Sequence, residues 1–425
     1  MRLEDLARVW QPSRLKGIQL SKEYGTAFLA ATQVFDLRPV PRKFLSLDRT
    51  DSVKERMVSR GQIMVTCSGS VGRATLAHVP HENTLISHDL LRVTPLDERA
   101  WGWIYAYLRS SQGRAMMSAA QYGHIIKHLE PSHLRSLPVP ALRDDLMREF
   151  NAKATRILDL RIKAYASAAQ AEAEFAACFP SLVRAKQETG FIVSASSMFS
   201  GRRRLEASCF TPTSGEIEAA FSKDAHRVDM LANVTKRIFV PGRFKHVYGD
   251  GGMPYLDSAD ILEVNPDITK FVLSLSHEEQ KAYHVEPGWL LIPCSGQVYG
   301  NIGHSVLATD WHTAKIHTNH LMRVVPNEQI RSGYLQCVLG HPELGRPRIV
   351  KFAFGSSVPE IAPNDILPIA VPRLDAAIEN RLADLMDASA VARDQADELE
   401  QEIGNDAEHL IDLYLEGDTA SFSIP

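Results

Sequence analysis

The sequence predicts an α+β protein made of two tandem mixed α/β domains, each followed by a long helix, with the two helices forming an antiparallel coiled coil. Three observations support this prediction. A glycine-rich strand occurs twice, an internal repeat surrounds it over most of the chain, and a long segment with helical spacing closes each half. A chain of 425 residues is also long enough for two domains that each bury a core.

The repeated strand is the clearest local signal. The first copy reads Gly61-Gln-Ile-Met-Val-Thr-Cys-Ser-Gly-Ser-Val-Gly72, and the second reads Gly288-Trp-Leu-Leu-Ile-Pro-Cys-Ser-Gly-Gln-Val-Tyr-Gly300. Each copy is a short apolar run that Gly opens and Cys-Ser-Gly closes. This pattern predicts a buried strand that enters a tight turn, with glycine where φ is positive or where another backbone comes close.

The repeat extends well beyond this strand. At an offset of 227 residues Lys43-Phe44 matches Lys270-Phe271, and at an offset of 232 Pro140 matches Pro372. Repeats of about 20–50 residues indicate a solenoid. A period near 230 residues instead indicates two copies of a unit that contains a domain and a helix.

Within the first copy, apolar spacing and proline placement predict the elements in order. They are a short helix over 3–9, strands at 28–29, 34–35 and 44–45, the strand after Gly61, a helix over 101–108, and an extended segment over 137–140. In the second copy, Gly249-Asp-Gly-Gly252 is predicted to be a flexible loop before a strand at 255–256. Both copies are therefore expected to be mixed domains with many short strands.

Each half ends in a long segment with helical spacing. Leu146, Phe150, Ile157 and Leu160 recur at steps typical of a helix in the first half. The second half has a longer run in which steps of four and three alternate almost throughout: Ile378, Leu382, Leu385, Ser389, Ala392, Ala396, Leu399, Ile403, Ala407, Leu410 and Tyr414. Such steps form a coiled-coil seam, although two ordinary core helices would also give an apolar stripe. We expect the seam residues Leu382, Leu385, Leu399 and Ile403 to pack in antiparallel fashion against Phe150, Ile157 and their neighbours.

These patterns give the following boundaries: a first domain over 1–140, a first spacer helix over 141–187, a second domain over 188–372, a second spacer helix over 373–416 and a tail over 417–425. Charge follows this division. Residues 1–140 hold 19 Lys/Arg and 12 Asp/Glu, whereas residues 373–425 hold 3 Arg and 14 Asp/Glu. The net charge of −4 therefore does not argue against a polyanionic partner for the domains.

Composition also predicts the compartment. The five cysteines are odd in number and include no Cys-x-x-Cys, which predicts a reduced, cytoplasmic protein without disulfides. No run of eighteen apolar residues occurs, and the first residues lack the apolar core of a signal peptide, so we expect no membrane association.

Motifs for enzyme chemistry are absent from the sequence. It contains no phosphate-binding Gly-x-x-x-x-Gly-Lys-Ser/Thr, no His-Glu-x-x-His, no cluster with zinc spacing and no Asn/Asp-Pro-Pro-aromatic loop of an amino-methyltransferase. Cys67 and Cys294 could be considered as nucleophiles, but each ends a repeated strand, where a small side chain packs at a turn. We therefore predict a protein that has no catalytic residues and binds no metal or other cofactor.

Basic loops interleaved with aromatic residues favour a nucleic-acid-binding protein, because Lys and Arg neutralise phosphates and polar side chains contact base edges. Ser68 and Ser295 are expected to cap turns, and Arg202 to Arg204 could equally form a solvated charged linker. The candidate DNA-contacting residues are Arg42, Lys43, Ser70, Arg73 and His88 in the first half, and Arg202, Arg203, Arg204, Lys236, Arg237, Arg243, Lys245, Lys270, Gln297, Tyr299, Asn301 and Asn319 in the second.

The repeated Gly-x-Ile/Leu strand with Ser-Gly-x-Val-Gly, the run from Ile361 to Pro372 and the order domain, helix, domain, helix resemble the specificity (S) subunit of type I restriction–modification systems. The resemblance covers nearly the whole chain. It differs at Cys67 and Cys294, which replace a polar residue often seen there, and at Tyr299, which widens the second turn.

The resemblance implies a noncatalytic subunit for phage defence, whose two target-recognition domains each contact one half of a split double-stranded DNA site. Two methyltransferase (M) subunits and the restriction (R) translocase-nuclease subunits would then act on that site. S-adenosylmethionine, Mg²⁺ and ATP are expected on those partners. The alternatives are the specificity fragment of a single-chain restriction–methylation enzyme, or the DNA-binding scaffold of another defence system.

Overall fold

The two copies of the repeat lie in two different units of the chain. The computed structural model describes residues 1–14, 17–50, 53–120, 128–182, 190–199 and 203–423. The first unit contains Met1–Tyr165, Glu263–Asn265 and Ala392–Pro425, and the second contains Ala166–Leu262 and Pro266–Val391. Each unit is therefore assembled from separate parts of the sequence.

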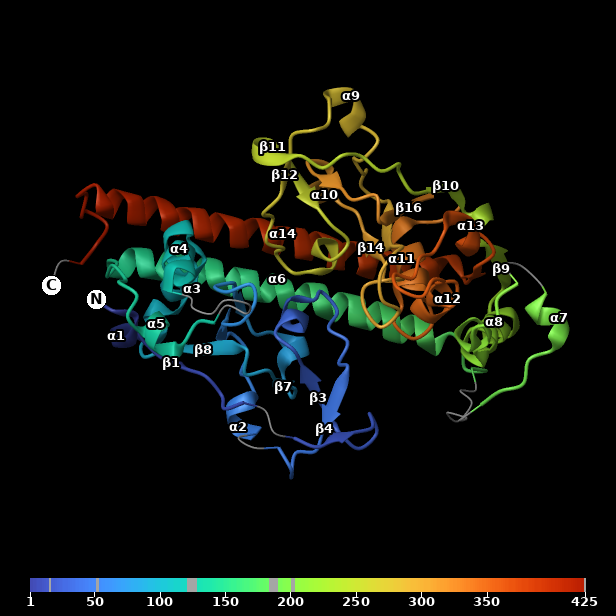
Figure 1. Cartoon of the computed structure of the whole chain (residues 1–425), viewed down its shortest axis with the longest axis horizontal. Helices are drawn as coiled ribbons and strands as arrows, with labels where there is room; N and C mark the ends of the chain where they lie inside the picture. Colours follow the sequence, from blue (N-terminus) through green and yellow to red (C-terminus); the bar gives the residue numbers. More distant parts are fainter. Residues whose placement is uncertain (15–16, 51–52, 121–127, 183–189, 200–202, 424–425) are drawn as a thin grey trace. The chain divides into compact units, whose positions relative to one another are not determined.

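The first unit begins with a mixed α/β domain (Figure 1). Its elements are α1 (Leu3–Leu6), β1 (Ala7–Trp10), β2 (Gln19–Leu20), β3 (Thr26–Leu29), β4 (Lys43–Leu45), α2 (Val53–Arg56), β5 (Ile63–Thr66), β6 (Ala74–Leu76), β7 (Leu85–Ile86), β8 (Leu90–Pro95), α3 (Trp101–Arg109), α4 (Ser111–Ala120), α5 (Pro131–Arg135) and the start of α6 (Asp144–Ala177).

The second unit contains the second mixed domain. Its elements are α7 (Ala195–Met198), α8 (Pro212–Asp224), β9 (Arg227–Met230), β10 (Thr235–Phe239), β11 (Tyr248–Leu256), β12 (Phe271–Val272), α9 (His277–Gln280), β13 (Leu290–Pro293), β14 (Val306–Leu307), α10 (Asp310–Thr313), β15 (Ile316–His317), β16 (Leu321–Pro326), α11 (Ser332–Gly340), α12 (Arg346–Val350), α13 (Pro363–Ile366), β17 (Ala370–Arg373) and the start of α14 (Ala376–Leu415).

The repeated glycine strand has the same neighbours in both units. In the first unit the strand order is β1-β8-β5-β6, and in the second it is β10-β16-β13-β14, with every neighbouring pair antiparallel. The two glycine strands, β5 and β13, are completely buried, as their apolar runs predict. The predicted duplication is thus confirmed in the sheets.

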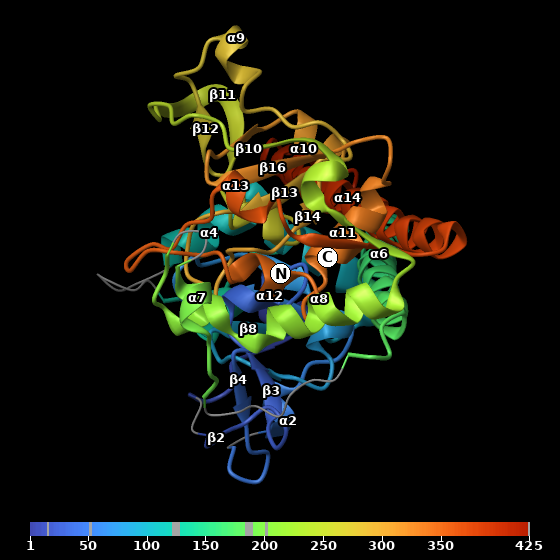
Figure 2. The same ribbon diagram turned by 90° about the vertical axis from the view of Figure 1, so that its right-hand side faces the viewer.

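A second small sheet repeats the same pairing. β3 lies antiparallel to β4 and parallel to β7, and β11 lies antiparallel to β12 and parallel to β15. β2 adds to the edge of β4 in the first unit, and Figure 2 shows β2, β3 and β4 beside one another. Gly249 to Gly252, predicted to be a loop, lies within β11, where the register with β12 is irregular. The prediction of a loop was wrong because these residues belong to the strand, although the pairs with β12 involve only Tyr248, Met253 and Pro254 and the glycine run itself bulges out of the pairing.

Equivalent backbone hydrogen bonds close the two glycine turns. The amide of Cys67 donates to the carbonyl of Asp89 over 3.0 Å, and the amide of Cys294 donates to the carbonyl of His320 over the same distance. The carbonyls of Cys67 and Cys294 accept from Leu129 at 2.9 Å and from Ile361 at 2.8 Å. The repeat therefore extends to individual hydrogen bonds.

A buried arginine stabilises the loop before each central strand. Arg92 donates to the carbonyls of Leu90, Ile86 and Ser87. Arg323 donates to the carbonyls of the residues at equivalent positions in the second copy: Leu321, His317 and Thr318. Burial lowers the pKa of both guanidinium groups to about 10, so both stay charged at neutral pH. Each buried charge is solvated by backbone carbonyls in place of water.

The two long helices pack against each other within each unit. In the first unit Phe150 and Ile157 of α6 share a core cluster with Ile403 and Ala407 of α14, while Leu160 packs with Ala392 and Ala396. As the residue number increases along α6, the number of the partner residue on α14 decreases. The two helices are therefore antiparallel, as predicted. Among the described residues no helix is long and apolar enough to cross a membrane.

The predicted helix seam is correct in its middle and wrong at its ends. Ile378 and Tyr414 are exposed, whereas Leu382 lies in the core of the second unit with Ala171 and Phe175. The sequence had paired Leu382 with the region of Phe150 and Ile157. Because the helices run antiparallel, Leu382 near the start of α14 meets the end of α6 instead.

Some predicted element bounds also differ from the structure. The helix expected over 3–9 ends at Leu6 because Ala7 to Trp10 pair with β8 as β1. Val34 and Phe35, expected in a strand, form a 3-10 turn with both side chains buried. α6 ends at Ala177, shortly before Pro180, which disfavours a helical residue ahead of it. The rest of the predicted first spacer helix includes 183–187, outside the described residues.

Glycine allows a helix to approach each long helix closely. A Cβ atom at Gly102 of α3 would lie 2.4 Å from the backbone of Phe150, and one at Gly333 of α11 would lie 2.5 Å from the carbonyl oxygen of Ala383. The hydrogen bonds beside these contacts are also equivalent, since Trp103 Nε1 donates to the carbonyl of Pro140 and Tyr334 Oη donates to the carbonyl of Pro372. A side chain at either glycine would force the helices apart.

We therefore expect Gly102→Ala to lower the free energy of unfolding by about 2 kcal/mol, because the new methyl group overlaps backbone atoms that cannot rotate away. Gly215→Ala is a matched control, since Gly215 is an exposed helical glycine of α8 with no atom within 4 Å of the added Cβ. It should raise the free energy of unfolding by about 0.5–1 kcal/mol. Urea denaturation measures both values, and equal effects would contradict the close-packing account.

Candidate nucleic-acid interface

The glycine turns place polar side chains at the surface of each unit. Gly69 and Gly296 adopt positive φ values of 73° and 131°, as the sequence predicts for the tight turns. The Ser68 hydroxyl lies 3.2 Å from His128 Nδ1, and the Ser295 hydroxyl lies 2.7 Å from His320 Nδ1. Each shared serine therefore ties its turn to a histidine of another loop.

The cysteines of these turns are packing residues. Cys67 and Cys294 are buried, and burial raises the pKa of each thiol to about 11. Cys67 also accepts a hydrogen bond from Gln11 Nε2 at 3.3 Å. At neutral pH both thiols are protonated, which is unsuitable for a nucleophile. Within the part of the chain that the structure describes, no three His, Cys, Asp or Glu side chains form a group that could hold a metal ion.

In the first unit, Arg42 and Lys43 are exposed at the start of β4, and Ser70 is exposed in the glycine turn. Asp36 is mostly buried, and the pKa of its carboxyl group is raised to about 7, first by burial and then by the nearby Glu263, against the opposing effect of Arg42. Because Arg42 and Lys43 are exposed, their charged groups can approach a polyanion from solvent.

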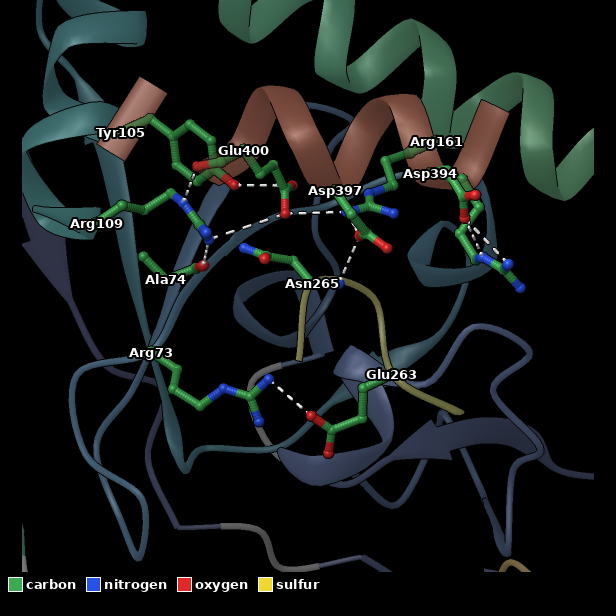
Figure 3. Close-up of polar contacts among 11 residues, drawn as sticks. Arg73, Ala74, Tyr105, Arg109, Arg161, Glu263, Asn265, Asp394, Asp397 and Glu400 are labelled. Carbon is green, nitrogen blue, oxygen red and sulfur yellow. Dashed lines mark hydrogen bonds and ion pairs between the residues drawn. The ribbon is translucent and has the colours of Figure 1, made fainter. Parts of the chain in front are cut away.

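Arg73 and His88 have other contacts. The Arg73 guanidinium forms an ion pair of 2.8 Å with Glu263 and lies 4.1 Å from the centre of the Phe35 ring. His88 is partly buried, and its Nε2 lies 3.6 Å from Asp89 Oδ1. Figure 3 shows Arg73 pointing toward Glu263. These contacts give Arg73 a structural role, and DNA contact by either residue stays a prediction.

The second unit presents a group of exposed basic and aromatic residues ahead of β11 and along it. Arg243 and Lys245 are exposed on either side of Phe244, whose ring packs on Tyr283 with 4.6 Å between ring centres. His246 follows and lies 4.4 Å from the Phe244 ring. The charged side chains of Arg243 and Lys245 are thus exposed to solvent, while the ring of Phe244 holds the segment against the domain.

Tyr248 and Lys270 extend this group. Tyr248 is exposed at the start of β11 and lies 5.9 Å from the buried ring of Tyr255. Lys270 is exposed beside β12, 3.4 Å from Asp257. The pKa of His246 is lowered, mainly by burial and then by Lys270. We define the basic–aromatic surface as Arg243, Lys245, His246, Tyr248 and Lys270.

His246 and Tyr248 are not among the candidate DNA-contacting residues predicted from the sequence, although His246 ends the basic run Arg243-Phe-Lys-His246. The available signal was the run Arg243-Phe-Lys-His-Val-Tyr248, in which charged and aromatic residues alternate with the period of an extended chain. Nearby, Lys236 pairs with Glu328 at 2.5 Å, and the Arg237 guanidinium lies 3.7 Å from the centre of the Phe239 ring.

The candidate DNA-contacting residues in and near the second glycine turn differ in their exposure to solvent. Gln297 and Tyr299 are exposed, and Gln297 Nε2 donates to the carbonyl of Ser357 over 3.1 Å. Asn301 is partly buried and Asn319 is buried. Arg346 is partly buried and donates to the carbonyls of Val298 and Gly300, so it holds this turn in place.

The basic run at 202–204 divides in the structure. Arg202 lies outside the described residues. Arg203 is exposed with a positive φ of 53°. Arg204 is largely buried and donates to the carbonyls of Lys351 and Ala353 at 3.1 and 2.6 Å, which fixes the start of the second domain. Only Arg203 of the described pair therefore presents its charge to solvent.

Comparisons with known proteins give structural matches only. No protein-family model matches this chain, and no curated protein matches its sequence. A crystal structure of a type I restriction–modification S subunit from M. genitalium matches with 15% identity and a TM-score of 0.34, over 97% of this chain and 94% of that chain. An HsdS subunit from Thermoanaerobacter tengcongensis matches with 14% identity and a TM-score of 0.29, over 98% and 96% of the two chains.

A third similar structure comes from work on complex assembly and conformational transition of the type I R-M system. It has 14% identity and a TM-score of 0.30, and covers 96% of this chain and 99% of that chain. The identities and TM-scores of all three matches are low. The site and the function below rest on the contacts within the chain itself.

Proposed function

We propose that this chain is the DNA-specificity subunit of a type I restriction–modification complex, in which each repeat contacts one half of a bipartite target. The observation that carries this proposal is the duplication itself. The two domains share strand order, turn-closing hydrogen bonds and a buried arginine. The exposed residue of the glycine turn differs, with Ser70 in one and Gln297 in the other. Two domains with the same backbone framework but different exposed side chains are suited to bind two different DNA sequences.

Methylation and cleavage are proposed to belong to partner M and R subunits, which would also bind S-adenosylmethionine, Mg²⁺ and ATP. The proposed place of action is the cytoplasm, on double-stranded DNA. The docking surface proposed for the two M subunits is the exposed acidic face of α14, which includes Glu398 and Asp412 and continues to Glu416 directly after the helix. Asp397 and Glu400 do not belong to this face because both are buried.

The long helices would hold the two readers at a fixed separation. B-DNA repeats about every 34–36 Å, so two readers need a defined distance to contact grooves on one side of a duplex. α6 has 34 residues and α14 has 40, and each helix contributes to both compact units. A hydrogen-bonded helix keeps its length under thermal motion far better than a flexible linker does.

The basic–aromatic surface can be tested through salt dependence. We expect the purified full chain to bind a duplex of random sequence with an affinity that falls steeply as salt rises. Each lost phosphate contact should lower the slope of log K against log[salt] by about 0.9. The double variant Arg243→Ala/Lys245→Ala should therefore lower the slope by about 1.8.

The control for this test is Lys223→Ala/Arg227→Ala, which removes two exposed positive charges of the same unit outside the basic–aromatic surface. It should leave the slope close to that of the unaltered chain. A flat salt response of the unaltered chain would contradict phosphate binding, and equal slopes for the two double variants would show that the surface lies elsewhere.

The helices can be tested by insertion. Four helix-forming residues placed between Tyr165 and Ala166, together with four between Val391 and Ala392, keep the α6–α14 pairing within each unit unchanged. The insertion lengthens the helix pair by about 6 Å and rotates one end by about 40°. Because base pairs rise about 3.4 Å, methylation should move to the same half-sites with a spacer about two base pairs longer. Methylation mapping with the M subunit reads this out, and an unchanged spacer would refute it.

A further inference from the structure

A buried charge network lies between the long helices in the first unit. Arg161 of α6 donates through Nη2 to Asp397 and to Glu400 of α14, the latter at 3.0 Å (Figure 3). The three side chains are only 5%, 3% and 3% exposed. Ions this deeply buried lose most of their hydration, so they are tolerated only with close partners of opposite charge.

The network continues beyond the helix pair. Tyr105 Oη donates to Glu400 at 3.0 Å, and Arg109 Nη1 lies 3.9 Å from the same carboxylate. The backbone amide of Asn265 donates to Asp397 at 2.8 Å. Two guanidinium groups therefore balance two carboxylates, and further donors reach the carboxylates from α3 and from the segment 263–265.

The apolar contacts around this network define the helix register only weakly. Leu160 packs there with Ala392 and Ala396, and Ala164 and Leu399 lie at its border. Alanine side chains are single methyl groups that interlock little with their neighbours. If α6 moved along α14 by one helical turn, small apolar groups would still be buried at these positions. The charged groups have no such freedom, since each must meet its partner within hydrogen-bonding distance.

A slip of one turn would disrupt the network in either direction. A shift of four residues one way would bring Arg161 opposite Arg393, which is also buried and pairs with Asp394 at 3.1 Å. The opposite shift would move Arg161 towards Gly404 and leave the two carboxylates without its charge. Like charges, or uncompensated ones, are costly at a buried site.

We propose that Arg161, Asp397 and Glu400 are positioning residues that set the register of α6 against α14. This proposal deepens the function above and rests on it in one respect: if the helices space the two readers, then the register also sets the distance between the half-sites. The network would thus determine which spacer length is methylated, without touching DNA.

The register can be measured without DNA. Spin labels at the exposed positions Arg156 of α6 and Glu398 of α14 report the helix offset by pulsed electron–electron resonance, after Cys178→Ser and Cys209→Ser remove the two partly exposed cysteines. The unaltered network should give one narrow distance. Arg161→Met/Asp397→Leu/Glu400→Leu should keep the helix content but add a population displaced by about 5 Å, one helical turn.

The matched control is Lys153→Met/Glu402→Leu/Asp406→Leu. It removes one base and two acids between the same helices, but these side chains are 33%, 52% and 42% exposed. This control should keep the single distance. If the buried triple variant also keeps it, the register proposal is wrong.

If the buried triple variant fails to fold, the isosteric pair Asp397→Asn/Glu400→Gln serves in its place and should broaden the distance distribution. A single unchanged distance in that folded variant would also overturn the proposal. Methylation mapping tests the helix register and the proposed function separately. If the triple variant shows a second spin-label distance and also methylates sites with a second spacer length, both proposals are supported. A second distance with one unchanged spacer confirms the register role and counts against the helices as spacers.

Discussion

The fold depends on the sharing of the two long helices between the cores. The largest apolar cluster of the first unit is completed by Ile403, Ala407 and Ile411 of α14, the helix that follows the second domain. The largest cluster of the second unit is completed by Ala171 and Phe175 of α6, the helix that follows the first domain. Neither repeat can therefore bury its core with its own residues alone. This constraint links the duplicated sequence to the pairing of the helices.

Much of this architecture could be predicted from the sequence because its signals are local or repeated. The second copy of the glycine strand supplied an internal comparison, and the positive φ of Gly69 and Gly296 follows from the turn chemistry that both copies share. The spacing of α14 also predicted its burial, with Ala396 and Ile403 fully buried as expected. Predictions failed where a partner distant in sequence decides the structure, as when β8 draws Ala7 to Trp10 into a strand.

The candidate site was predicted less well, since a sequence shows the charge of a residue but not its surroundings. Arg346 belongs to the basic run Arg346-Pro-Arg348, yet it holds the second glycine turn through backbone carbonyls. Arg73 pairs with Glu263, which is 190 residues away in the sequence. Conversely, the acidic run of α14 gave no sign that Asp397 and Glu400 face inward, because their partners, such as Arg161, lie far away in the sequence.

The central claim is that each repeat reads one half of a split DNA site. The most direct measurement is genome-wide methylation mapping in a host that carries this chain and its methyltransferase, before and after residues 1–140 are exchanged for those of a relative. The exchange leaves both long helices in place, together with the side chains that they contribute to the two cores. We predict that one half of the methylated sequence changes while the other half and the spacer are kept. A change in both halves, or in neither, would contradict the account.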